Sequence, residues 1–222
     1  MDTSNRFRDL TVAQFVDALA SGEPVPGGGA AAAIAGSLGA ALVAMVANLS
    51  AGRPKYAEHT ALLDRTIPAA RELQERMLAL ADEDAEAFAG YGAAMKLPRD
   101  TDEEKSIRTA AIRGAALAAT LSPLKTVEAT LEIVALAEAL AGRSNKNASS
   151  DLEVAALMSV AACRAAAANV FINLPSLGDE TRARDLYART EGIADVVERL
   201  AAQTRELVRK GEARDPLPET PA

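Results

Sequence analysis

One aspartate lies on an otherwise apolar face of a long predicted helix. Residues spaced by three and four along this segment share one narrow stripe at about 100° per residue; they are Leu73, Met77, Leu80, Asp84, Phe88, Tyr91 and Met95. A carboxylate on such a face is costly unless it is paired, and burial raises its pKa. Asp84 is therefore either a core carboxylate held by an arginine or a backbone N–H of another helix, or a general acid or base. This helix alone favours neither.

Three consecutive glycines precede a stretch without charges. Gly27, Gly28 and Gly29 follow a proline and lead into residues 30–50. The pattern matches neither a Walker loop nor a dinucleotide fingerprint, because no strand precedes it and the spacing differs. The glycines leave backbone N–H groups unencumbered at the start of a helix, which suits an anionic or carbonyl-bearing ligand. The alternative is a flexible turn into the core.

A second predicted helix carries polar residues at both ends of one face and alanines between them. This face consists of Asp151, Ala155, Met158, Ala162, Ala166, Asn169 and Asn173. Two interpretations remain open. Either the alanines form a close-packed seam between a capping aspartate and a frayed end, or the terminal amides line a groove that can hydrogen-bond a flat heterocycle. Glu128, on a mostly apolar side of another helix, is interpreted as one partner of a buried or interface ion pair.

The sequence offers few residues for metal or nucleophilic chemistry. It contains one histidine, His59, and one cysteine, Cys163. Only carboxylates could therefore complete a zinc site, and no nucleophile has a supporting base. We expect His59, which lies among polar residues, to be exposed, and Cys163, which lies among alanines, to be a small buried side chain.

Composition narrows the class of protein. The 222 residues are 49% hydrophobic but only 3% aromatic, and alanine and leucine are the strongest helix formers. A net charge of −7 argues against a nucleic-acid partner. A lone cysteine and an N-terminus without an apolar signal region predict a cytoplasmic protein.

Residues 30–50 are long enough to span a bilayer. Strongly apolar residues are nevertheless sparse there, no aromatic belt flanks the segment, and Asn48 lies inside it. A helix that is apolar all round is also expected in the middle of a larger protein. We therefore predict a buried helix and no membrane partner.

The remaining chain is almost entirely helical in pattern. Predicted helices cover residues 11–20, 30–50, 56–95, 101–120, 122–141, 151–173 and 179–210, with Pro68 expected to kink or break the third and Pro123 to start the fifth. The predicted fold is all-α, a bundle of about six to seven helices around a buried Ala/Gly-rich central helix. We expect a single domain over residues 1–212 and a disordered tail over residues 213–222.

Six short motifs occur in an order that is typical of a known family. They are VPGGGAAAAIAGSLGAALVAMVANLS, RPKY, LADEDAEAF, MKLPRDTDEEK, NASSDLEVAA and NVFINL. Together they resemble the cyclodeaminase/cyclohydrolase family over residues 8–210. This family includes the cyclodeaminase half of formiminotransferase-cyclodeaminase and the stand-alone methenyltetrahydrofolate cyclohydrolases. The resemblance implies a helical homodimer that binds tetrahydrofolate derivatives near its subunit interface, without metal or any cofactor beyond the folate substrate.

The resemblance also implies roles for particular residues. The family's catalytic aspartate lies in the acidic motif before Ala-Phe, which corresponds to Asp84. The glycine turn, Gly27–Gly29, is implied to lie against the folate, and Lys55 and Lys96 are assigned to the carboxylates of its glutamyl tail. The further positions that match substrate-binding motifs are Tyr56, Asn147, Ser150, Asp151, Asn169 and Asn173.

The expected reaction is hydrolysis of 5,10-methenyltetrahydrofolate to 10-formyltetrahydrofolate by general acid and base catalysis. The alternative is a cyclodeaminase that closes 5-formiminotetrahydrofolate and releases ammonia. The folate domain begins within the first ten or so residues and no transferase domain accompanies it, which favours the cyclohydrolase. A non-catalytic helical scaffold and a folate-binding protein without activity are the hypotheses of other classes.

Overall fold

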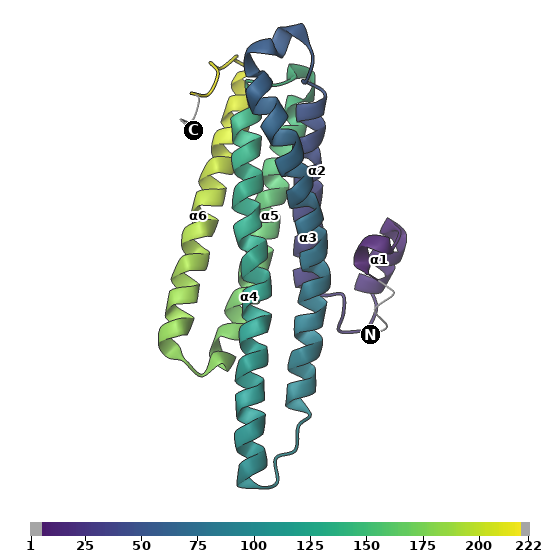
Figure 1. Ribbon diagram of the computed structural model, residues 1–222, viewed down its shortest axis with the longest axis vertical. Coiled ribbons are helices and arrows are strands. Elements are labelled where there is room, and N and C mark those ends of the chain that lie inside the picture. Colours follow the sequence, from purple (N-terminus) through teal and green to yellow (C-terminus); the bar gives the residue numbers. More distant parts are fainter. Residues whose placement is uncertain (1–5, 219–222) are drawn as a thin grey trace.

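Five long helices form an elongated bundle, and a short helix lies beside it (Figure 1). The computed structural model describes residues 6–218. The bundle consists of α2 (Gly28–Asn48), α3 (Thr60–Met95), α4 (Asp102–Leu140), α5 (Ser149–Asn173) and α6 (Glu180–Lys210). The short elements are α1 (Val12–Leu19) and the 3-10 turns η1 (Phe7–Asp9), η2 (Pro54–His59), η3 (Lys146–Ala148) and η4 (Leu174–Leu177). No strand occurs in residues 6–218, and the all-α prediction is confirmed.

Side-chain caps set the starts of three helices where the sequence predicts them. Thr11 caps α1 and Thr101 caps α4, each in a capping box that a residue three positions later completes. Asp179 caps α6 by accepting the N–H of Arg182 at 2.9 Å. Each cap satisfies a backbone donor that the first helical turn would otherwise leave unpaired.

The central helix, α2, packs against α3, α5 and α4, as predicted for the Ala/Gly-rich segment. Its glycines allow this close approach: a Cβ at Gly36 would collide with the side chain of Met77, and one at Gly39 would lie 3.3 Å from the carbonyl oxygen of Ala155. Two segments, 28–48 and 146–177, are long and apolar enough to cross a membrane. In the structure both segments pack within the helical bundle.

Both prolines expected to interrupt helices lie inside continuous ones. Pro68 is within α3 and Pro123 within α4. A proline lacks the N–H that would bond the carbonyl four residues earlier, so that carbonyl needs another donor. For Pro123 the donor is the side chain of Asn173, which bonds the carbonyl oxygen of Ala119. The predicted helix break at residues 121–122 is therefore wrong.

His59 and the C-terminal segment also differ from expectation. The side chain of His59 is 4% exposed, because η2 folds it under the bundle end instead of leaving it in solvent. The tail that we predicted to be disordered from residue 213 makes contacts as far as Leu217, which packs against the core. Arg214 donates to the carbonyl oxygens of Glu138 and Ala141, at 2.9 and 3.1 Å. Residues 219–222 lie outside the described residues.

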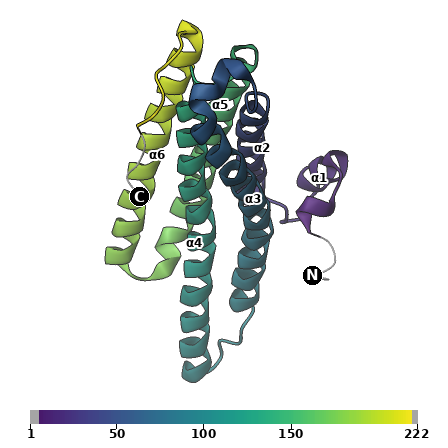
Figure 2. The ribbon, with the colours of Figure 1, turned by 45° about the horizontal axis from the view of Figure 1, so that its top comes forward.

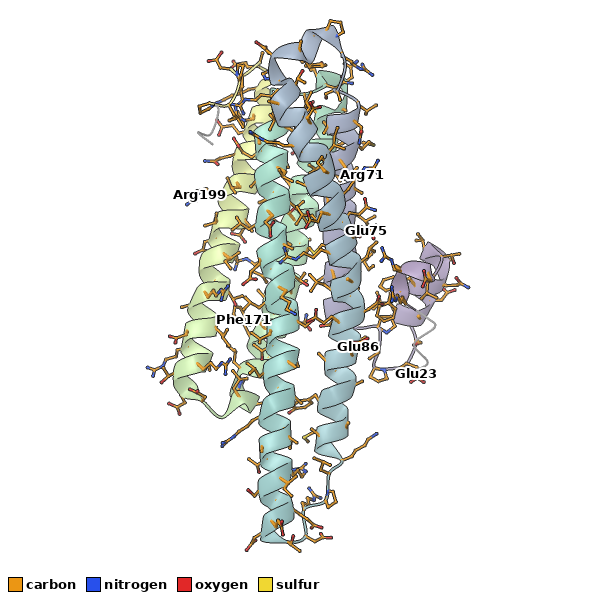
Figure 3. All side chains as sticks on the ribbon, in the orientation of Figure 1. Glu23, Arg71, Glu75, Glu86, Phe171 and Arg199 are labelled. Carbon is orange, nitrogen blue, oxygen red and sulfur yellow. The ribbon has the colours of Figure 1, made fainter. Side chains whose placement is uncertain are left out.

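Two parts of the molecule extend from the five-helix core. The helix α1 lies apart from the bundle, and η1 ties it to α3 because the Phe7 N–H donates to Asp82 at 2.8 Å and Arg8 pairs with Glu75 (Figure 1). The far ends of α3 and α4 extend beyond α5 and α6 as a helical hairpin (Figure 2). In the all-side-chain view, Glu75 and Glu86 lie on the side of α3 nearest α1 (Figure 3).

Candidate functional site

A cavity of about 380 Å³ opens at the N-terminal end of α2. Four bundle helices and the segment before α2 line it: Pro24, Val25, Gly27, Gly28, Gly29, Asp84, Ala85, Phe88, Tyr91, Ala119, Asn169, Ile172 and Asn173. Asp84 is the only charged side chain among the described residues that line it. The cavity thus brings together the glycine turn, the aspartate of the apolar stripe and the two asparagines.

The carboxylate of Asp84 packs directly against Gly29. A Cβ built on Gly29 would lie 2.5 Å from Asp84 Oδ2 and closer still to Oδ1 and Cγ. Any side chain at this position would therefore displace the carboxylate, and glycine is required for this contact. By contrast, a Cβ at Gly28 would meet Asn169 Nδ2 at 3.6 Å, an ordinary contact distance.

Burial raises the pKa of the Asp84 carboxyl above its ordinary value, and the backbone N–H of Ala30 opposes that shift. Ala30 belongs to the first turn of α2, whose N–H groups have no acceptor within the helix. Neither of these two causes is a charged side chain. Of the two core partners considered for Asp84, the described residues therefore supply a backbone N–H, that of Ala30, and not an arginine. A half-buried carboxyl with a raised pKa beside a cavity is a candidate general acid and base.

The two asparagines lie one turn apart on α5, with their amide nitrogens engaged. Asn169 Nδ2 donates to the carbonyl oxygen of Ala165 at 2.9 Å. Asn173 Nδ2 donates to the carbonyl oxygens of Ala119 at 2.8 Å and of Asn169 at 2.9 Å. Between these residues and the start of α5, Ala155, Ala162 and Ala166 are buried, so the predicted alanine seam and the terminal amides occur on one helix face.

The other predicted binding residues do not line this cavity. Lys55 and Tyr56 belong to η2, and Asn147 lies in η3, at the opposite end of α2. Ser150 and Asp151 lie in the first turn of α5 at that same end, and Lys96 follows the end of α3 in the hairpin loop. Their assignment to the substrate stays a prediction.

A smaller cavity of about 100 Å³ lies near that opposite end. Lys55, Tyr56, Lys146 and Ser149 are among the residues that line it. The Tyr56 hydroxyl accepts the backbone N–H of Lys146 at 3.3 Å, so this tyrosine holds η3 in place. Two lysines line this smaller cavity, but none of its described lining residues is a carboxyl packed against the start of a helix, as Asp84 is in the larger cavity.

Several cavity residues were not identified as binding residues from the sequence. Phe88 and Tyr91 were on the apolar stripe, and their spacing of four and seven residues from Asp84 could have indicated a shared wall. Val25, Ala119 and Ile172 carry no such signal in the sequence. Glu128 pairs with Arg189 of α6 at 2.6 Å, so the predicted ion pair occurs, but its arginine is exposed and the pair is not buried.

No group of three or more His, Cys, Asp or Glu side chains is placed to hold a metal ion within residues 6–218. The Cys163 side chain is buried, as predicted, and burial raises the pKa of its thiol. The chemistry that the described cavity offers is therefore that of one carboxyl, free backbone N–H groups and two amides.

Known proteins are similar to this chain in sequence and in fold. Residues 11–192 match the family described as formiminotransferase-cyclodeaminase. The chain is 42% identical over 183 residues to a methenyltetrahydrofolate cyclohydrolase of Methylorubrum extorquens, which covers 82% of this chain and 88% of that protein. It is 36% identical over 166 residues to a formimidoyltransferase-cyclodeaminase of Gallus gallus, covering 75% of this chain but 31% of that longer protein.

The crystal structure of a formiminotetrahydrofolate cyclodeaminase from Thermotoga maritima superposes with a TM-score of 0.83 at 27% identity. The superposition covers 91% of this chain and 98% of that one. The chain belongs to the formiminotransferase-cyclodeaminase family, as the six motifs predict.

Proposed function

We propose that this protein hydrolyses 5,10-methenyltetrahydrofolate to 10-formyltetrahydrofolate, with Asp84 as the general base and acid. The observation that carries the proposal is the Asp84 carboxyl, whose pKa is raised and which faces the cavity at the start of α2. The 42% identity to a methenyltetrahydrofolate cyclohydrolase over most of both chains supports this choice of substrate.

The reaction needs only modest assistance. The bridging carbon between N5 and N10 is already electrophilic in the methenyl compound. Water attacks this carbon while the Asp84 carboxylate takes a proton from the water. The bond from the carbon to N5 then breaks and N5 receives the proton from Asp84. The second proton of the water leaves to solvent as the C=O bond forms, which offsets the positive charge of the methenyl substrate, and the formyl group stays on N10. General acid–base help of this kind is worth about 10²–10⁴-fold in rate.

The remaining cavity residues suit the binding of a flat, polar heterocycle. Phe88 and Tyr91 supply aromatic surface, and Asn169 and Asn173 supply amide groups. Gly27 and Gly28 leave backbone N–H groups open to a carbonyl oxygen at the start of α2. Because no described cation lines the cavity, the carboxylates of a glutamyl tail must be met outside it.

The second candidate reaction is the cyclodeamination of 5-formiminotetrahydrofolate with release of ammonia. The resemblance to the Thermotoga maritima cyclodeaminase favours it. The two reactions separate in one experiment: the purified protein is incubated with 5,10-methenyltetrahydrofolate, and the loss of its ultraviolet absorbance is compared with the spontaneous rate. The protein is then given 5-formiminotetrahydrofolate, and ammonia is measured.

Accelerated hydrolysis without ammonia release supports the cyclohydrolase. Ammonia release without accelerated hydrolysis replaces it with the cyclodeaminase. If neither reaction occurs, thermal stabilisation by folinic acid separates a folate-binding protein from a scaffold, since only the former gains stability from the ligand.

We also infer a homodimer. Large apolar side chains are exposed along α2 and the neighbouring part of α5, namely Leu38, Met45, Leu49, Val154 and Leu157. Large contiguous apolar patches are rare on monomeric proteins, so we infer that a partner subunit covers these side chains. An antiparallel pairing of two α2 helices, each about 30 Å long, would bring the Lys55 end of one protomer towards the cavity of its partner. Light scattering should give twice the chain mass of 23.0 kDa, and a monomer would contradict the dimer.

A further inference from the structure

The proline inside α4 leaves one backbone carbonyl without its helical donor. Pro123 has no N–H, so the carbonyl oxygen of Ala119 loses the bond that residue 123 would normally make. Ala119 lines the cavity. Asn173, from α5, supplies the missing donor through Nδ2 at 2.8 Å.

These contacts fix which way the Asn173 amide points. Its NH₂ group serves two carbonyl oxygens, those of Ala119 and Asn169. A flipped amide would set its oxygen against both carbonyl oxygens, which is repulsive. Asn173 Oδ1 is therefore the free atom, and no described residue donates to it. Asn169 is oriented in the same sense, because its Nδ2 bonds the Ala165 carbonyl.

Pro68 provides an internal comparison. It also lies inside a long helix, α3, but it is exposed, and so is Asp64, whose carbonyl it leaves without a donor. Solvent can serve the carbonyl of Asp64. The Ala119 carbonyl instead anchors a side chain of the cavity wall, so the proline in α4 has a consequence at the site that the proline in α3 lacks.

We infer that Asn173 Oδ1 accepts an N–H from the donor edge of the substrate's pterin ring, and that Pro123 is a positioning residue for Asn173. The identity of the ligand rests on the proposed function. The pterin ring carries an exocyclic amino group next to a ring N–H, which together form an edge of donors. Two amide oxygens one helical turn apart on the cavity wall are acceptors of the matching kind.

The link between Pro123 and Asn173 can be tested without any ligand. Asn173→Ala removes the side-chain donor of the Ala119 carbonyl and should lower Tm by about 3 °C. Pro123→Ala restores the backbone donor, so adding Asn173→Ala to it should cost much less. This difference is the coupling of a double-mutant cycle. Pro68→Ala is the matched control, and Asn173→Ala should cost as much in that background as in the wild type. Equal losses in all three backgrounds would overturn the link.

The role in binding is tested with the two halves of folate as inhibitors of methenyltetrahydrofolate hydrolysis. In Asn173→Ala, Ki for 6-methyltetrahydropterin should rise about tenfold, the loss expected for one hydrogen bond, while Ki for 4-aminobenzoylglutamate stays unchanged. Pro123→Ala should shift the first value in the same direction by about fivefold, and Pro68→Ala should not. Equal shifts for both fragments would show a merely structural role and overturn the inference.

The outcomes remain separable from failure of the proposed function. A wild-type protein that neither hydrolyses nor binds reduced folates overturns the proposed function and the choice of ligand together. A wild-type protein that is active while Asn173→Ala keeps the wild-type Ki for the pterin fragment overturns this inference alone. If Asn173→Ala fails to fold, the double variant with Pro123→Ala carries the binding test, because its Ala119 carbonyl is satisfied.

Discussion

Replacing Gly29 with alanine should inactivate the protein without unfolding it. The added methyl group would lie 2.5 Å from Asp84 Oδ2 and nearer to Oδ1 and Cγ, whereas ordinary contacts begin at 3.4 Å. The colliding atoms are the end of a short side chain, which can rotate away, so the backbone need not move. The carboxylate must retreat by about 1 Å, and a misplacement of that size can cost about 10²-fold in rate.

The thermal stability of the Gly29→Ala variant should not fall with its activity. Alanine is a better helix former than glycine by up to about 1 kcal/mol, so Tm should stay the same or rise slightly. The assay is the absorbance of 5,10-methenyltetrahydrofolate, with a thermal melt of the same sample. Gly90→Ala is the control, because a Cβ there meets nothing within 4 Å and Gly90 does not line the cavity. A Gly29→Ala variant that keeps wild-type turnover would refute the assignment of the catalytic position.

Three further outcomes follow from the structure. Asp84→Asn should fold, bind folinic acid in a thermal-shift assay and lose at least about a hundredfold in turnover; near-wild-type turnover would rule out Asp84 as the base. The raised pKa of Asp84 means that the folded state holds this proton more tightly than the unfolded state, so its stabilising effect is complete below the ordinary aspartate pKa and is lost as pH rises through the raised pKa. The Tm of Asp84→Asn should therefore exceed the wild-type Tm at pH 7, and this difference should be smaller at pH 4. A Tm difference that is larger at pH 4 than at pH 7 would contradict the raised pKa of Asp84. Thr101→Ala removes the α4 cap and should destabilise the fold by about 1 kcal/mol in urea unfolding, with unchanged turnover because Thr101 lies outside the cavity.

The class of fold could be predicted because the signals are local. Alanine-rich periodic segments and caps such as Thr11, Thr101 and Asp179 fix where helices form and start. The effect of Pro123 could not be predicted, since whether a helix continues through proline depends on an external donor. Here that donor is Asn173, which is distant in the sequence and comes close only in the folded bundle.

In the candidate site, too, some residues could be predicted from local sequence patterns and others could not. Asp84 and the asparagines were found because a polar residue on an apolar helix face is unusual and has a fixed period. The lysines and the Asn147–Asp151 segment were placed by resemblance, which indicates that residues take part but not which end of a helix they occupy.

Residues of α2, α3, α4 and α5 line the cavity that contains Asp84, and no residue of α6 lines it. A bound ligand therefore opposes only those fluctuations that separate the first four of these helices. Transient detachment of α6 would leave the ligand in place, so amide hydrogen exchange in α6 through such openings should not respond to ligand concentration, whereas exchange in α2 should slow in proportion to it. Ligand binding would then stabilise α2, α3, α4 and α5 against local unfolding, while α6 would continue to open independently of the ligand.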